Sequence, residues 1–137
     1  ISQLSRLNKM VKIRQDAALL YDGLLDEAYG ITPQKKLDNF QNSFHLYALQ
    51  INYWDYGINR TDLMNFLKEH GIGTQVHYIN VYHHPYYQNH FAIRHGYCQN
   101  AELYYSRALS LPLFVDLKDK TVISIVKRLL EGLNRNK

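Results

Sequence analysis

The sequence is poor in cysteine and contains neither a long apolar run nor a long basic run. Its one cysteine, Cys98, excludes an internal disulfide framework and favours a reducing compartment, so we expect a cytoplasmic protein. No apolar stretch is long enough to cross a bilayer, so no membrane partner is expected. The formal net charge of +4 is modest, so the sequence gives no reason to expect nucleic acid as a partner.

The rest of the composition is that of an ordinary folded domain. Hydrophobic residues make up 46% and charged residues 20% of the 137 residues, which is enough chain for one domain with a core. The chain begins with Ile1 rather than methionine, and this residue already lies within a helical pattern. We therefore expect this chain to be the C-terminal part of a longer one.

Apolar residues recur with helical spacing in several segments. They recur at steps of three, four and seven between Leu4 and Ala28, which predicts one long helix. Asn59 is predicted to cap the next helix, with Asp62 completing an imperfect capping box, and Gly71 is predicted to end it. Two further helices are predicted at 101–108 and 118–133.

Three stretches between the helices are predicted to be strands, at 43–53, 74–78 and 109–112. The first has apolar residues on both faces, which indicates a strand covered on both sides or central in its sheet. The polar residues 30–42 before it predict a loop, and residues 53–57 predict a turn. This order predicts an α+β fold: a small, mostly antiparallel sheet with helices packed on one side, preceded by a long helix.

The segment 71–87 contains the most plausible place for a ligand. The alternation over 74–78 predicts that Val76 and Tyr78 face the core, while His77 faces the other side. Pro85 then ends any regular pairing, because it has no N–H to donate. The ring-rich residues 83–96 are expected to be irregular or to form short helical turns.

The histidines and tyrosines also permit other interpretations. A metal site could use the four histidines of this region, His83, His84, His90 and His95, but no cysteine or acidic partner stands at ligand spacing. Cys98 could be a nucleophile beside His95, but no base with an orienting partner can be identified. The twelve tyrosines could stack on single-stranded nucleic acid, although their spacing along the sequence is that of residues in a core. We prefer a role for these rings in the core and at interfaces.

Three segments resemble, in the same order, motifs of the DegT/StrS sugar aminotransferases. Residues 71–87, GIGTQVHYINVYHHPYY, resemble the family's GI-x-T-x-VHY-x-PVH-x-x-PYY segment. Residues 43–47, SFHLY, resemble its S-x-HLY strand, and residues 100–114, NAELYYSRALSLPLF, resemble its NAE-x-YY-x-x-xLSLPLF run. The resemblance covers nearly the whole chain. The sequences of these motifs are most similar to those of members acting in pseudaminic acid synthesis.

The resemblance implies a pyridoxal-phosphate enzyme that aminates a nucleotide-linked 4-keto-6-deoxy sugar for surface-polysaccharide or pseudaminic-acid-type synthesis. It implies that residues 1–29 are a linking helix and that residues 30–137 are the small C-terminal domain of the aspartate-aminotransferase fold type. The lysine that holds pyridoxal phosphate would lie in a large domain absent from this chain, and no matching lysine motif occurs here. The chain alone would then hold no cofactor and catalyse nothing. Its expected partners are that large domain, the nucleotide sugar and a second copy in a homodimer.

By the same resemblance, the substrate-binding residues are His77, Tyr78 and Tyr82, with no catalytic or metal-binding residue in this chain. Tyr82 stands where the family usually has a second histidine, and a tyrosine cannot change its charge near neutral pH as imidazole can. For His77, the alternative is a structural hydrogen bond to neighbouring backbone. Three expected prolines are replaced, by Asn80, Gln99 and Val115, which should loosen those loops.

Two other functions remain open. The chain could be a stand-alone binding module that kept the small-domain fold and exposes the first helix and the ring-rich segment to a partner. It could also be a histidine-rich metal protein.

Overall fold

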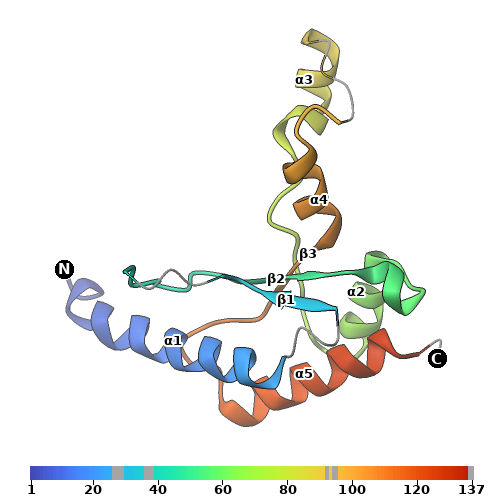
Figure 1. Ribbon diagram of the computed structural model, residues 1–137. Coiled ribbons are helices and arrows are strands. Elements are labelled where there is room, and N and C mark those ends of the chain that lie inside the picture. The colour runs from blue at the N-terminus through green and yellow to red at the C-terminus, as the bar shows by residue number, and fades with distance from the viewer. Residues whose placement is uncertain (26–29, 36–38, 92, 94–95, 136–137) are drawn as a thin grey trace.

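The computed structural model describes residues 1–25, 30–35, 39–91, 93 and 96–135. A long helix is followed by a three-stranded sheet and further helices, which confirms the predicted α+β class (Figure 1). The elements are η1 (Leu4–Arg6), α1 (Leu7–Leu24), β1 (Ile31–Pro33), β2 (Tyr47–Ile51), η3 (Tyr53–Tyr56), α2 (Arg60–Glu69), η4 (Val81–His83), α3 (Pro85–His90), α4 (Gln99–Arg107), β3 (Ala108–Leu111) and α5 (Asp119–Leu133).

The sheet is antiparallel throughout, in the order β1-β2-β3. Within β2, burial alternates, with Tyr47, Leu49 and Ile51 buried and the two residues between them half-buried. The buried face packs on α1 and α5, which lie together on one side of the sheet (Figure 1). The opposite face of β1 and β2, which we call the open face, carries Thr32, Ala48 and Gln50.

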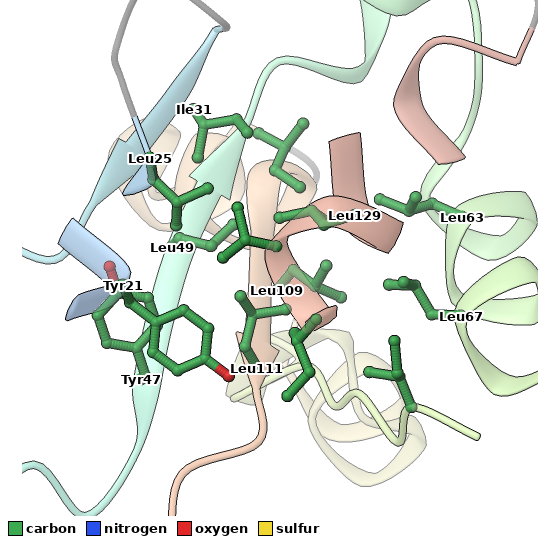
Figure 2. Packing of buried hydrophobic residues seen from close by; sticks show 14 of the residues in the cluster. Tyr21, Leu25, Ile31, Tyr47, Leu49, Leu63, Leu67, Leu109, Leu111 and Leu129 are labelled. Carbon is green, nitrogen blue, oxygen red and sulfur yellow. The ribbon is translucent and has the colours of Figure 1, made fainter. Parts of the chain in front are cut away.

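The core lies between the sheet and the helices (Figure 2). The rings of Tyr21 from α1 and Tyr47 from β2 stack with their centroids 4.5 Å apart. The hydroxyls of these two tyrosines have partners, because Tyr21 donates to the Pro112 carbonyl at 2.9 Å and Tyr47 donates to Asp22 at 2.6 Å. These bonds tie α1 to β2 and to the segment after β3, so the helix is anchored by more than its apolar face.

The predicted helices agree well with the observed ones. The first runs over Leu7–Leu24 after a short η1 turn, and Ala28 lies outside the described residues. Asn59 caps α2 as predicted, since its side chain accepts the Asp62 N–H at 2.9 Å. Gly71 follows the helix in the left-handed conformation, with φ of 74°. The last two helices differ from their predicted bounds by one or two residues.

The predicted strands were less accurate. Residues 30–42 were predicted as a loop, but they contain β1, which pairs with β2. The predicted strand 43–53 begins only at Tyr47. The predicted strand 74–78 is wrong, because this segment makes a single isolated bridge, between Gln75 and Ser110. Tyr78 is 71% exposed rather than in the core. Alternation over five residues does not reveal whether a partner strand is available along their whole length.

The described residues between 79 and 107, which we call the arm, project away from the sheet (Figure 1). They contain the short helices predicted for the ring-rich segment, η4 and α3, followed by α4. No residue of these three helices is buried. None of the helices within the described ranges is long and apolar enough to span a bilayer.

Candidate functional site

A hollow of about 620 Å³ lies over the open face of the sheet. Its floor includes Thr32, Ala48 and Gln50, which share that face because their positions alternate along β1 and β2. The rest of its lining comes from residues 33–35, the segment before β2, Leu49 in β2, residues 77 and 78, and Tyr104 in α4. The hollow therefore combines segments that lie far apart in the sequence.

His77 lines this hollow and is fixed on two sides. Its ring nitrogen Nδ1 lies 2.9 Å from the hydroxyl oxygen of Ser110, in β3. The hydroxyl of Tyr104, from α4, donates to the backbone carbonyl of His77 at 3.3 Å. The alternative predicted for His77 was a hydrogen bond from its ring to neighbouring backbone. In the structure the partner of Nδ1 is instead a side chain, that of Ser110.

Tyr78 lies beside His77 in the same lining. The two rings meet edge to face, with centroids 4.7 Å apart, and the peptide bond between the two residues is cis. Most of the Tyr78 side chain is exposed, so its ring face and hydroxyl are accessible to a ligand in the hollow. An accessible aromatic face next to an imidazole can pack on a sugar ring or a base and can also donate a hydrogen bond.

Tyr82, the third predicted site residue, lies apart from the other two. It is in η4, and its hydroxyl donates to Glu102 at 3.1 Å and accepts from Asn80 at 3.2 Å. Glu102 also accepts the Gly96 N–H at 2.7 Å, so it ties the two sides of the arm together. Desolvation, together with the hydrogen bond to Glu102, raises the pKa of Tyr82 above its ordinary value. These contacts of Tyr82 lie within the arm, and its predicted contact with a substrate stays a prediction.

Sequence reasoning missed several residues of the site, among them His45, Tyr104 and Ser110. His45 lines the hollow next to Phe44, which is buried and has φ of 45°. The Asn42 side chain accepts the Phe44 N–H at 2.8 Å and so stabilises this bend. All three residues lie inside the quoted motifs, but no local pattern indicates that these motifs meet at one place.

The histidines do not form a metal site in the part of the chain that the structure describes. No group of three or more His, Cys, Asp or Glu residues is close enough there to hold a metal ion, and His95 lies outside the described residues. Instead, the ring of His90 stacks on Tyr86, with centroids 4.4 Å apart. Cys98 is exposed, and its backbone carbonyl oxygen lies 3.4 Å from the hydroxyl oxygen of Tyr82.

The lysines that the structure describes do not fit a covalent pyridoxal-phosphate site. Such a lysine has to be desolvated, so that its amine can lose its proton. All the lysines within the described ranges are exposed: Lys9, Lys12, Lys35, Lys68, Lys118, Lys120 and Lys127. Among these described lysines, only Lys35 lines the hollow, and it is exposed. What the hollow offers is a set of hydrogen-bonding and aromatic groups.

Comparison with known proteins gives consistent results along nearly the whole chain. A family model, described as the DegT/DnrJ/EryC1/StrS aminotransferase family, matches residues 1–130. The spore coat polysaccharide biosynthesis protein SpsC of Bacillus subtilis is 36% identical over 128 residues, which are 93% of this chain and 33% of that protein. A Helicobacter pylori protein named UDP-4-amino-4,6-dideoxy-N-acetyl-beta-L-altrosamine transaminase is 28% identical over 131 residues, 96% of this chain and 34% of that protein.

Solved structures agree with the fold. Helicobacter pylori PseC, an aminotransferase involved in the biosynthesis of pseudoaminic acid, superposes with a TM-score of 0.88 at 28% identity, covering 98% of this chain and 35% of that one. A proposed sugar aminotransferase of Streptococcus pneumoniae in its PLP form has a TM-score of 0.85 at 24% identity, covering 98% and 34%, and supports the fold alone. The chain thus spans about a third of the length of the curated relatives it matches.

Proposed function

The chain belongs to the DegT/DnrJ/EryC1/StrS aminotransferase family, and from this premise we propose that it is the small C-terminal domain of a nucleotide-sugar aminotransferase. In this proposal, residues 1–29 link it to a large domain and residues 30–137 form the small domain. The observation that carries the proposal is the hollow on the open face, where His77, Tyr78 and Tyr104 surround a space of about 620 Å³.

The role of this chain is to provide one wall of the substrate site. The hydrogen-bonding groups of His45, Gln50 and His77 suit sugar hydroxyls, and the ring of Tyr78 suits the face of a sugar or base. Pyridoxal phosphate, which members of the family bind, would be held by residues outside this chain, because the described lysines are all exposed. The chain by itself is therefore proposed to be inactive.

The proposed substrate is a nucleotide-linked 4-keto-6-deoxy sugar used for surface polysaccharide or pseudaminic-acid-type synthesis in the cytoplasm. The name of the Helicobacter pylori relative supports the class of sugar, and that of the Bacillus subtilis relative supports a polysaccharide pathway. His77 and Tyr78 would contact the substrate directly. Tyr82 is included through the resemblance of its motif, and its hydroxyl would act through the arm that it helps to hold.

The proposed protein partners are the large domain and a second copy of the enzyme. Support comes from two exposed apolar regions. Leu19 and Phe40 line a second hollow, of about 540 Å³, beside α1, which suits a helix that packs on two domains. The arm exposes several large rings, among them Tyr86 and Phe91 at 61% and 50%.

Binding of a nucleotide sugar to the open face tests this proposal. We would titrate the ¹⁵N-labelled 137-residue chain with UDP-N-acetylglucosamine, a stable stand-in for the keto-sugar, and follow backbone amide shifts. We expect shifts at residues 76–78 and at Tyr104. His77→Gln should weaken the binding about tenfold, the factor that about 1.4 kcal/mol gives. His90→Ala, which changes an exposed histidine of the arm, should leave it unchanged.

Three results would contradict the proposal. The first is equal weakening by His77→Gln and His90→Ala, and the second is no shift at the open face at millimolar ligand. The third is turnover by the isolated chain when it is incubated with pyridoxal phosphate, glutamate and a UDP-linked 4-keto-6-deoxy sugar, because that reaction would require a cofactor lysine within these residues.

A stand-alone binding module is the second candidate function, and the exposed rings of the arm favour it. The same titration separates the two candidates. A binding module predicts no response of the hollow to the sugar nucleotide. It also predicts concentration-dependent broadening of resonances from α3 and α4, as the exposed rings contact another molecule.

A further inference from the structure

We infer that Ser110 is a positioning residue that holds His77 as the tautomer with its proton on Nε2, so that the hollow presents an N–H donor to its ligand. The ligand group facing His77 must then be an acceptor oxygen: a carbonyl, a hydroxyl or a phosphate. The role of this donor in ligand binding rests on the proposed function. The tautomer of His77 and its dependence on Ser110 can be tested without any substrate.

The hydroxyl of Ser110 is held in a fixed place. Ser110 lies within β3 and is only 5% exposed. Its backbone N–H donates to the Gln75 carbonyl at 2.8 Å, and its carbonyl accepts the Gln75 N–H at 3.2 Å. This bridge holds the segment that carries His77 against β3, two residues before the histidine itself. Strand, bridge and side chain together therefore fix the imidazole.

The direction of the hydrogen bond follows from counting donors and acceptors. The Ser110 hydroxyl has one hydrogen to donate, and within the described part of the chain His77 is its only side-chain partner. If Nδ1 carried the proton, it would donate to Ser110, and the buried hydroxyl hydrogen would be left without an acceptor. Leaving a buried donor unpaired is unfavourable. The hydroxyl therefore donates to Nδ1, and the proton of a neutral imidazole is on Nε2.

The other nitrogen of the ring is available to a ligand. Nδ1 and Nε2 lie on different edges of the imidazole, so Nε2 points away from Ser110. His77 lines the hollow, and Nε2 has no hydrogen-bond partner among the residues that the structure describes. The Tyr104 hydroxyl holds the His77 carbonyl from the α4 side. A donor fixed in this way selects for an acceptor oxygen at one position of the ligand.

The experiment is to measure the tautomers of the histidines in the ¹⁵N-labelled 137-residue chain by long-range ¹H–¹⁵N correlation near pH 8.5, where histidine is ordinarily neutral. His77→Gln identifies the His77 signals. His70 and His90 are internal references, because the Nδ1 of each lies 2.8 Å from a backbone carbonyl and must carry the proton. We expect His77 to carry its proton on Nε2, in contrast to these two histidines.

Ser110→Ala should reduce the preference of His77 for the Nε2–H tautomer about fivefold, the factor that one ordinary neutral hydrogen bond gives. Ser110→Thr, which keeps a hydroxyl, should preserve it. A protonated Nδ1 in the wild-type chain would overturn the inference, whether or not either variant folds. So would an unchanged tautomer ratio in a folded Ser110→Ala variant. Failure of the sugar nucleotide to bind would contradict the proposed function and leave this tautomer result standing.

Discussion

Gly132 lies where α5 crosses α2, and the space beside it is too small for a methyl group. A Cβ atom built on Gly132 would lie 2.6 Å from a ring carbon of Phe66 and 2.8 Å from a methyl carbon of Leu63. Both neighbours belong to the buried core, so neither can move away without disturbing other contacts. Gly23, in α1, is the opposite case, because a Cβ there would have no atom within 4 Å.

These two glycines give a matched pair of variants. Gly132→Ala should destabilise the fold by about 1–3 kcal/mol, because overpacking outweighs the gain in helix propensity. Gly23→Ala should stabilise it by about 0.5–1 kcal/mol, because only the propensity changes. Urea unfolding followed by circular dichroism measures both. A neutral or stabilising Gly132→Ala would show that the helices separate easily at this crossing.

The residues that sequence reasoning placed correctly have local causes. Asn59 caps α2 through a bond to a residue three positions later, and Gly71 provides the left-handed backbone after the helix end. The role of Ser110 could not be predicted, because its partner His77 is 33 positions away. The exposure of Tyr78 was mispredicted for a similar reason, since it depends on which segment lies over it.

At the scale of elements, the attachment of the arm depends on Arg60 at the start of α2. Its guanidinium donates to the carbonyls of Tyr105 and, at 3.3 Å, Ala108, at the C-terminal end of α4. It also lies 4.7 Å from the ring centroid of Tyr105. A positive charge at a helix C-terminus is favourable, and the planar guanidinium can contact two carbonyls and a ring at once. Arg60 thus joins α4 to the body of the protein.

Arg60→Lys should loosen α4 although it preserves the charge, because one ammonium group cannot replace both hydrogen bonds and the ring contact. We expect local opening of α4 to become easier by about 1–2 kcal/mol, which is roughly 5–30-fold faster exchange of its amide hydrogens. The control is Arg128→Lys in α5, where the arginine pairs with Glu131 on the surface. Equal exchange of α4 in both variants would mean that Arg60 does not hold the arm.

Helices were predicted better than strands for a physical reason. A helix satisfies its backbone within one segment, so its apolar spacing and its caps are enough to locate it, as for α2 and α5. A strand needs a partner. The three-residue β1 has too short a pattern to be recognised, and it exists because β2 lies beside it. Segment 74–78 has the alternation of a strand but only one bridge to β3.

At the scale of the whole molecule, the same limit applies to the candidate site. The motifs indicated that residues 77 and 78 matter, and the structure places both in the hollow. The motifs could not indicate that His45, Gln50 and Tyr104 line the same hollow. These three residues come from other segments, and only the folded chain places them there. The fold also separates Tyr82 from the other two, since η4 lies in the arm.

The core of the molecule contains tyrosines that make the free energy of unfolding depend on pH in the alkaline range. Burial raises the pKa of Tyr21, Tyr47 and Tyr53 far above the ordinary value of 10.0, and a hydrogen bond to Asp22 raises that of Tyr47 further. In the unfolded chain these hydroxyls ionise near pH 10, whereas in the folded chain they stay protonated. Above pH 10 the folded state therefore binds more protons than the unfolded state, so the free energy of unfolding falls as the pH rises.

We predict that the three tyrosines together lower the free energy of unfolding by about 4 kcal/mol between pH 9 and pH 11, at about 1.4 kcal/mol each. Tyr53→Phe should remove about a third of this dependence. It should also be neutral or stabilising at pH 7, because the Tyr53 hydroxyl is buried without a hydrogen-bond partner among the described residues. Tyr86→Phe, at a tyrosine that is 61% exposed, is the matched control for loss of a tyrosine hydroxyl at the surface. Urea unfolding at several pH values measures the slope, and equal slopes for the wild type and Tyr53→Phe would mean that water reaches this part of the core.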